Sequence, residues 1–282
     1  MMATIFYTYL FIFGLIFWSF GSVLIFRWRS WKKWIIWGRS ECPSCQHILT
    51  TLDLIPFFSY VFLRWKCRHC ANKIWPLYPI LELSMWVLFL LTWMFLVDPN
   101  LIFSFNLVEI SKLILFLFIS FVIVIFTFYD ILYLEIPDEI LIPSIFVLFF
   151  LLLVSSIVKD FNIFNYFSTF SYQILNIPLI NWVIWASLIF SFFLFQILVS
   201  KWAWMWWWDL RIAVFMWLVW WTKIALLWLL IAYFLGSIFG IIILIKTRNK
   251  ENKIPFWPYL WAWIFISLMF HSQIVNWYFS IL

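Results

Sequence analysis

Glycine is scarce in this chain, with five residues among 282. That is far below the usual ~7%, although membrane helices normally carry extra glycine. Charged residues are also scarce, at 11% of the sequence, against ~25% in typical soluble domains. Apolar residues reach 67% and the mean hydropathy is +1.05. Together these values exclude a soluble globular domain and indicate an integral membrane protein.

Long apolar runs dominate what is present. A span of ~30 Å of hydrocarbon needs about 20 helical residues. Such runs lie near 4–26, 79–97, 110–128, 139–158, 179–200, 209–222, 223–245 and 257–281. The sixth run is short, so seven spans remain an alternative to eight. We predict an all-α, polytopic membrane protein of about eight transmembrane helices.

Lysine and arginine predict the orientation. Fifteen of the eighteen basic residues fall on one side of the predicted membrane: nine in 27–78, two at Lys201 and Arg211, and four in 246–253. The positive-inside rule places this side in the cytoplasm. The clustering in loops argues against nucleic-acid binding, despite a net charge of +6. Three parts are expected: a first transmembrane helix at 1–26, a cytoplasmic domain at 27–78, and a transmembrane domain at 79–282.

All four cysteines lie in the cytoplasmic segment, as Cys42-Pro-Ser-Cys45 and Cys67-Arg-His-Cys70. Two C-x2-C pairs at this spacing are typical of a closed tetrahedral zinc site. A reducing compartment favours metal over disulfide, although free-thiol or redox motifs are an alternative interpretation. We therefore predict a small zinc-ribbon-like domain held by structural zinc. His47 and His69 lie next to the cluster and are expected to be bystanders, because four thiolates fill the shell.

Two aspartates, Asp130 and Asp209, each stand where an apolar run meets a short polar break. A carboxylate at membrane depth costs roughly 2.5–3.5 kcal/mol on insertion scales. Two carboxylates suffice for aspartic-protease chemistry, but a helix-end aspartate facing water is the commoner role. Asp138 and Glu139 follow Ile136-Pro137 and fit a helix N-terminus. Asp53 is expected to cap or orient a local segment.

Ordered motifs along nearly the whole chain resemble those of the bacterial type IV prepilin leader peptidase family. The similar segments are Arg39-Ser40 with Cys42-Pro43, Asp53 to Pro56, Arg64 to Cys70, Tyr78-Pro79 to Glu82-Leu83, Asp130 with Ile136-Pro137-Asp138, Lys201 to Leu210, and Ile254 to Pro258.

The resemblance implies a G-x-G-D type membrane aspartyl protease with Asp130 and Asp209 as its catalytic pair. It implies prepilin or pseudopilin precursors as substrates, in type IV pilus or type II secretion systems. The expected location is the bacterial inner membrane, with the active site at its cytoplasmic side. It also implies a second activity, methylation of the new N-terminus with S-adenosylmethionine. Glu82 and Asp53 are candidates for methyl transfer or substrate contact.

Tryptophan stands at many positions where the family has glycine. Among the 24 tryptophans, this applies to Trp65, Trp202, Trp206, Trp208 and Trp257. Glycine permits positive φ and close backbone approach, and tryptophan permits neither. We hypothesise that UGA codons of this gene specify glycine, so that these tryptophans are glycine in the cell. UGG codons at 206, 208 and 257 would contradict this. If the tryptophans are real, the alternative is a catalytically inactive, zinc-stabilised membrane scaffold for pilus or secretion assembly.

Overall fold

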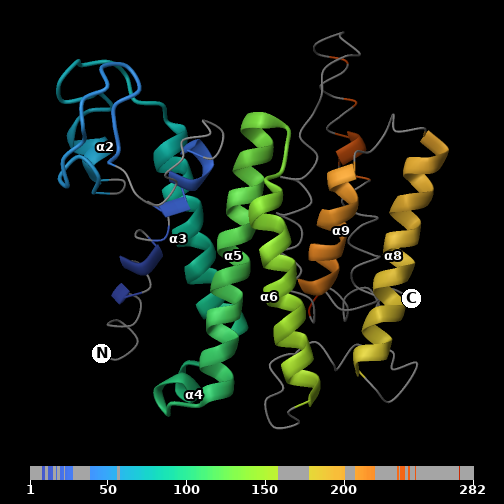
Figure 1. Ribbon diagram of the computed structural model, residues 1–282. Helices are drawn as coiled ribbons and strands as arrows, with labels where there is room; N and C mark the ends of the chain where they lie inside the picture. Colours follow the sequence, from blue (N-terminus) through green and yellow to red (C-terminus); the bar gives the residue numbers. More distant parts are fainter. Residues whose placement is uncertain are drawn as a thin grey trace. The chain divides into compact units, whose positions relative to one another are not determined.

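The computed structural model describes residues 39–55, 58–157, 178–200 and 207–219, with further single residues between 8 and 27 and between 234 and 273. These residues form helices and two isolated antiparallel bridges, Glu41 with Ile48 and Lys66 with Lys73. The helices are α2 Phe58–Phe62, α3 Leu77–Leu96, α4 Pro99–Phe103, α5 Leu107–Tyr133, α6 Asp138–Ile157, α8 Pro178–Ser200 and α9 Trp207–Val219 (Figure 1). The predicted helical character is thus confirmed for the described part.

The chain divides into two compact units. The first comprises Met1–Asn100 and Leu113–Phe128, and the second comprises Leu101–Lys112 and Tyr129–Leu282. The middle of α5 therefore belongs to the first unit and its two ends belong to the second.

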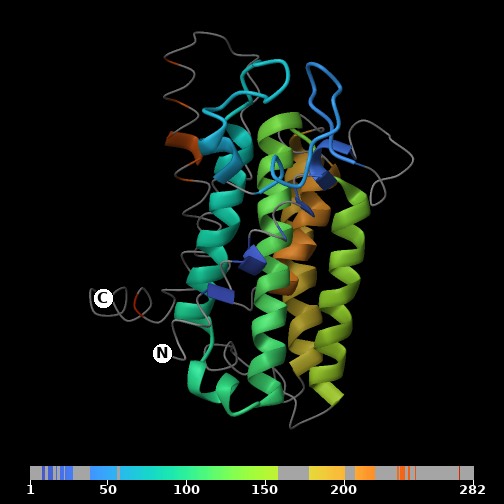
Figure 2. The same cartoon turned by 90° about the vertical axis from the view of Figure 1, so that its left-hand side faces the viewer.

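Within the first unit, α3 lies alongside the middle of α5 (Figures 1 and 2). Phe89 and Trp93 of α3 are fully buried, with 1% exposure each. The buried hydroxyls of Thr92 and Ser120 share a hydrogen bond of 3.2 Å. Such a bond between two membrane helices contributes about 0.6 kcal/mol on average, so apolar packing supplies most of the contact.

Two described helices are long and apolar enough to cross a membrane, α3 with 20 residues and α5 with 27. Both begin slightly before the predicted runs. α6 and α8 coincide with the runs predicted at 139–158 and 179–200. Most of the runs at 223–245 and 257–281, and part of the run at 4–26, lie outside the described residues. The count of eight spans therefore stays a prediction.

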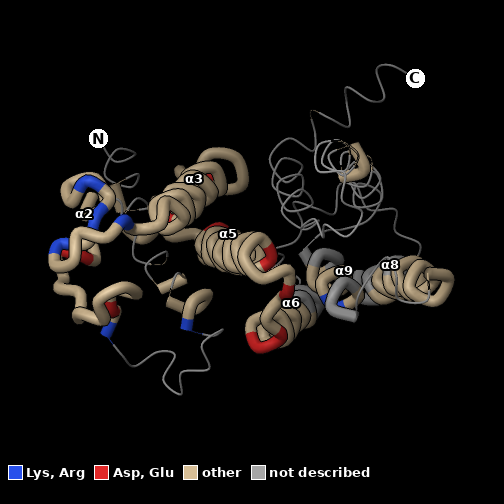
Figure 3. Tube along the Cα trace, turned by 90° about the horizontal axis from the view of Figure 1, so that it is seen from above, with Lys and Arg blue, Asp and Glu red and all other residues tan. Residues whose placement is uncertain are grey.

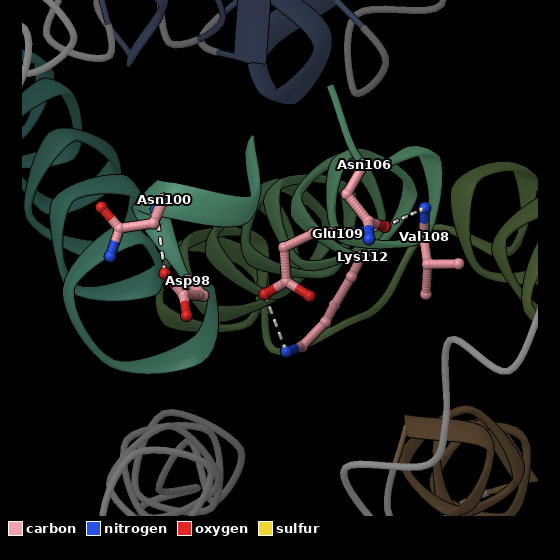
Figure 4. A network of polar contacts seen from close by, with 6 residues as sticks. All are labelled: Asp98, Asn100, Asn106, Val108, Glu109 and Lys112. Atoms are coloured by element: carbon pink, nitrogen blue, oxygen red, sulfur yellow. Dashed lines mark hydrogen bonds and ion pairs between the residues drawn. The ribbon is translucent and has the colours of Figure 1, made fainter. Parts of the chain in front are cut away.

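The first turn of α5 is held by polar contacts (Figure 4). The Asn106 side chain accepts the backbone N–H groups of Val108 and Glu109, at 3.0 and 3.2 Å. This is an N-cap, which satisfies N–H groups that have no partner within the helix. Glu109 then pairs with Lys112 at 3.1 Å, with side-chain exposures of 10% and 12%. The pairing explains how two charges are kept in a mostly buried place.

In the second unit, α9 packs between residues of α6 and α8. Buried side chains come from all three helices, among them Leu141, Phe193, Ile212 and Phe215. Charged segments gather around α2, whereas the tubes of α6 and α8 are mostly uncharged beyond the start of α6 (Figure 3).

Candidate functional site

The two cysteine pairs form matching backbone turns. The first turn has three bonds from a backbone N–H to a carbonyl. They run from Cys42 to His47 at 3.0 Å, from Gln46 to Cys42 at 2.9 Å, and from Leu49 to Ser40 at 2.8 Å. The same three bonds recur in the second turn, from Cys67 to Asn72 at 2.9 Å, Ala71 to Cys67 at 3.0 Å, and Ile74 to Trp65 at 2.8 Å. Gln46 and Ala71, equivalent in the two turns, both have positive φ, at 56° and 55°. A side-chain bond of 2.8 Å from Asn72 to Ser44 joins the turns.

These turns bring the four thiols together. The Sγ atoms of Cys42, Cys45, Cys67 and Cys70 all lie within 4.8 Å of one another, and those of Cys42 and Cys70 are 3.9 Å apart. Zinc–sulfur bonds of about 2.3 Å in a tetrahedron place sulfurs roughly 3.8 Å apart. The four residues therefore fit a zinc ion, and the predicted convergence of the two pairs is confirmed.

Local backbone groups shift the pKa of one thiol of this cluster towards the value that suits a metal ligand. The backbone N–H of Cys45, together with that of Ser44, lowers the pKa of the Cys42 thiol to about 7, although burial acts against this. The His47 N–H lowers the pKa of the Cys45 thiol, but burial and the neighbouring thiols outweigh it and raise that pKa to about 11. The backbone therefore favours, at Cys42, the thiolate that a metal requires. The rings of His47 and His69 stack with centroids 3.5 Å apart, and the cluster of candidate ligands among the described residues contains neither.

One family glycine position falls in this domain. Trp65 has φ of 65°, and its N–H donates to the carbonyl of Tyr60 at 3.0 Å, as the chain leaves α2. This left-handed region favours glycine and costs other residues roughly 1–2 kcal/mol. The Trp65 side chain is exposed, so packing offsets little of that cost. The backbone at this position therefore suits glycine, as the motif comparison predicts.

Trp65→Gly is expected to stabilise the cysteine domain by about 1 kcal/mol, because the strain of positive φ disappears. The measurement is the urea concentration at which the full-length protein releases its zinc, which should rise. Trp75→Gly is the control, because Trp75 is also exposed and its φ is not positive. An equal gain from both substitutions would contradict the argument from φ.

A cavity of about 700 Å³ lies between the cysteine domain, residues near the end of the first apolar run, and the start of α3. It is lined by charges of both signs: Arg27, Arg39, Arg68, Lys73, Glu41, Asp53 and Glu82. Tyr60, Trp75 and Tyr78 add aromatic walls. The two acids singled out in the sequence, Asp53 and Glu82, therefore line one cavity.

Asp53 also holds the cysteine domain together. Its carboxylate accepts the hydroxyl and the N–H of Thr50, at 2.7 and 3.1 Å. It pairs with Arg68 of the second cysteine turn at 2.9 Å, and its side chain is only 3% exposed. The Thr50 hydroxyl holds the pKa of Asp53 below its ordinary value against the effect of burial, helped by the Thr50 N–H, Arg68 and His69. The expected role in orienting a local segment agrees with these contacts.

In the second unit, Asp130 lies in the last turn of α5 and is 4% exposed. The helix ends at Leu134, whose φ is 54° and whose N–H donates to the Asp130 carbonyl at 2.9 Å. After a short connection, Asp138 begins α6, and the Pro137 carbonyl accepts the N–H groups of Ile140 and Leu141. The predicted helix-start position of Asp138 is thus confirmed.

Asp209 is the third residue of α9. Its pairing with Asp130, which the resemblance implies, stays a prediction. Trp208 is in the first turn of the same helix, while Trp206 and Trp257 lie outside the described residues. Arg211, two residues after Asp209, forms an ion pair with Asp138. This contact was not predicted from the sequence. A single arginine in an apolar helix nevertheless indicates that its charge needs an acidic partner.

Comparison with known proteins agrees with these features. Residues 12–96 match the family described as Bacterial Peptidase A24 N-terminal domain. The prepilin leader peptidase/N-methyltransferase of Aeromonas salmonicida (strain A449) is 27% identical over 254 residues, covering 86% of this chain and 75% of the relative. The protein of the same name from Aeromonas hydrophila is 28% identical over 252 residues, covering 85% and 74%.

A shorter match of higher identity involves the prepilin leader peptidase/N-methyltransferase of Bacillus subtilis (strain 168), at 42% identity over 80 residues, or 28% of this chain and 32% of the relative. No solved structure matches. The domain match and the long relatives together show that this chain is similar, over most of its length, to proteins of the type IV prepilin peptidase family.

Proposed function

We propose that this protein is a membrane aspartyl endopeptidase that removes the leader peptide of prepilin or pseudopilin precursors at the cytoplasmic membrane face. The observation that carries the proposal is the extent of the match to named peptidases. A match covering 86% of the chain includes both Asp130 and Asp209.

The chemistry assigned to the aspartates needs one proton between two carboxyl groups. When two carboxyl groups are held close, the repulsion between their charges disfavours ionisation of both, so they share one proton. The ionised carboxylate takes a proton from water as the water oxygen attacks the scissile carbonyl. The protonated carboxyl donates a hydrogen bond to the carbonyl oxygen, and the departing amine then receives a proton. The two pKa values belong to the pair, so neither Asp130 nor Asp209 is assigned as the acid.

Glycine at the positions of Trp206 and Trp208 would let the backbone of an extended substrate approach the start of α9. Tryptophan there would block that approach and would favour the alternative, an inactive zinc-stabilised scaffold for pilus or secretion assembly. The test compares the chain as written with the variant carrying Trp206→Gly, Trp208→Gly and Trp257→Gly. Both are purified in lipid and incubated with a pilin-like precursor. Cleavage by the glycine variant supports the peptidase, whereas two folded but inactive proteins would favour the scaffold.

A second activity, methylation of the new N-terminus, is favoured by the cavity at the cysteine domain. Its volume of about 700 Å³ lies in the ordinary range for small-ligand sites, and its mixed charges suit a zwitterionic ligand. S-adenosylmethionine, when bound, would supply a methyl group to the free amine, releasing a proton and the demethylated thioether. We assign contact with this ligand to Glu82, which lines the cavity from the first turns of α3.

Glu82→Gln is expected to lower N-methylation at least about 10-fold, because a charged hydrogen-bond partner of the bound cation is lost. Leader cleavage should change less than about twofold. The measurement is the transfer of radiolabelled methyl to precleaved pilin. Ser84→Ala is the matched control, because Ser84 lies on the same helix and its hydroxyl donates to the Leu81 carbonyl of that helix. Equal loss of methylation and cleavage in Glu82→Gln would contradict a separate methylation site.

A further inference from the structure

An ion pair links the segments that carry the two aspartates. Arg211 of α9 donates to a carboxylate oxygen of Asp138, the first residue of α6. Seventy-three residues separate the partners in sequence. Their side chains are 31% and 39% exposed, respectively, and the Arg211 Nε and the Asp138 Oδ1 are buried atoms.

The helix that carries Arg211 is well packed around it. Leu210, Ile212 and Ala213, which flank Arg211 along α9, are buried to 2% exposure or less. About a third of each side chain is exposed, so solvent screens part of the attraction, but the buried Arg211 Nε and Asp138 Oδ1 atoms still cost free energy when the partners separate. The Arg211–Asp138 contact therefore favours one relative placement of α9 and α6.

Each partner is rigidly connected to one aspartate. Asp209 and Arg211 lie in the same short helix, about 3 Å apart along its axis at 1.5 Å per residue. Asp130 and Asp138 flank a connection fixed at Leu134 by the bond to the Asp130 carbonyl and at Pro137 by the bonds from Ile140 and Leu141. A change in the pair would therefore move one aspartate relative to the other.

We propose that Arg211 and Asp138 are positioning residues, a clamp that sets the height and rotation of α9 so that Asp209 keeps its catalytic distance from Asp130. The inference rests on the proposed function, because it takes these aspartates as the catalytic pair. Misplacement of reacting groups by about 1 Å can cost 10²-fold in rate. The sequence predicted only a helix-end role for Asp138, and the clamp gives it a second one.

The first test measures proximity without activity. Asp130→Cys and Asp209→Cys are introduced together into the full-length, zinc-loaded protein, and a short bifunctional thiol reagent joins the two new thiols. We expect efficient joining, reduced at least threefold by adding Arg211→Ala or Asp138→Asn, and largely kept with Arg211→Lys. Glu139→Gln is the control, because Glu139 is an exposed neighbour of Asp138 in the same helical turn and should change nothing.

The outcomes separate the two claims. Thiols that fail to join with the clamp intact would contradict the catalytic pair itself, and the clamp with it. Thiols that join equally well with Arg211→Ala and Asp138→Asn would overturn the clamp and leave the catalytic pair standing. If Arg211→Ala does not insert into membranes, Asp138→Asn, which keeps a residue suited to a helix start, decides the matter.

The second test uses kinetics with the aspartates intact and with glycine at positions 206, 208 and 257. Asp138→Asn is expected to lower kcat about 10-fold with KM changed less than twofold, because a misplaced aspartate affects the reaction more than precursor binding. Arg211→Lys should retain kcat within about threefold, because the charge remains. A purely structural role would lower the amount of folded protein and leave kcat per folded molecule unchanged, which would overturn the proposal.

Discussion

Replacing either Asp130 or Asp209 with asparagine is expected to abolish leader cleavage, by at least about 10³-fold in kcat, as expected when one member of a catalytic unit is lost. Asparagine has nearly the same size, but it can neither take a proton from water nor share one with its partner. The background for this experiment is the variant with glycine at positions 206, 208 and 257. The measurement is the rate of precursor cleavage per folded molecule.

Folding and insertion serve as the control for both variants. Each should keep the zinc content and the thermal unfolding midpoint of its parent, because asparagine fits the same space. Glu139→Gln, an exposed acid in the first turn of α6, should cleave at the parental rate. If either aspartate variant retains near-full cleavage, that residue is not catalytic.

Loss of zinc is expected to unfold the cysteine domain. The domain has few apolar anchors, since Cys42 and Cys67 are its only residues among the buried hydrophobic side chains of the described part. Structural zinc contributes about 10–16 kcal/mol of apparent binding free energy in zinc-finger peptides. Cys67→Ser, or chelation of the parent, should therefore abolish zinc binding and expose residues 40–74 to protease. The measurements are the zinc-to-protein ratio and the sites of limited proteolysis.

His47→Ala is the matched control for the zinc prediction. Its ring stacks on that of His69 next to the cluster, but the four thiols already complete a tetrahedral shell. Zinc content should be unchanged in this variant. Loss of zinc from His47→Ala, or its retention in Cys67→Ser, would show that the ligand set is different.

The cysteine site could be predicted from the sequence because its information is local. Each C-x2-C pair specifies one tight turn, and the two turns repeat the same hydrogen bonds. The helices α3, α5, α6 and α8 could be predicted as well, because a long apolar segment that spans a membrane has few conformations other than a helix. The left-handed backbone at Trp65 agrees with the glycine expected there from motif comparison.

The Arg211–Asp138 pair could not be predicted in the same way. Its partners are 73 residues apart, and no short pattern specifies which of several acids an arginine meets in a packed bundle. The position of Asp138 at a helix start already explained why an acid stands there. Nothing in the local sequence therefore indicated a tertiary contact. The cavity shared by Asp53 and Glu82 likewise depends on how the cysteine domain folds over the start of α3.

The mass of a pilin-like precursor after incubation with the purified, zinc-loaded glycine variant tests the central claim most directly. We predict a single cut that removes the leader and leaves the hydrophobic segment intact, with no cut when Asp130→Asn is added. A precursor that keeps its full mass, although the protein is folded, holds zinc and has glycine at positions 206, 208 and 257, would contradict the account.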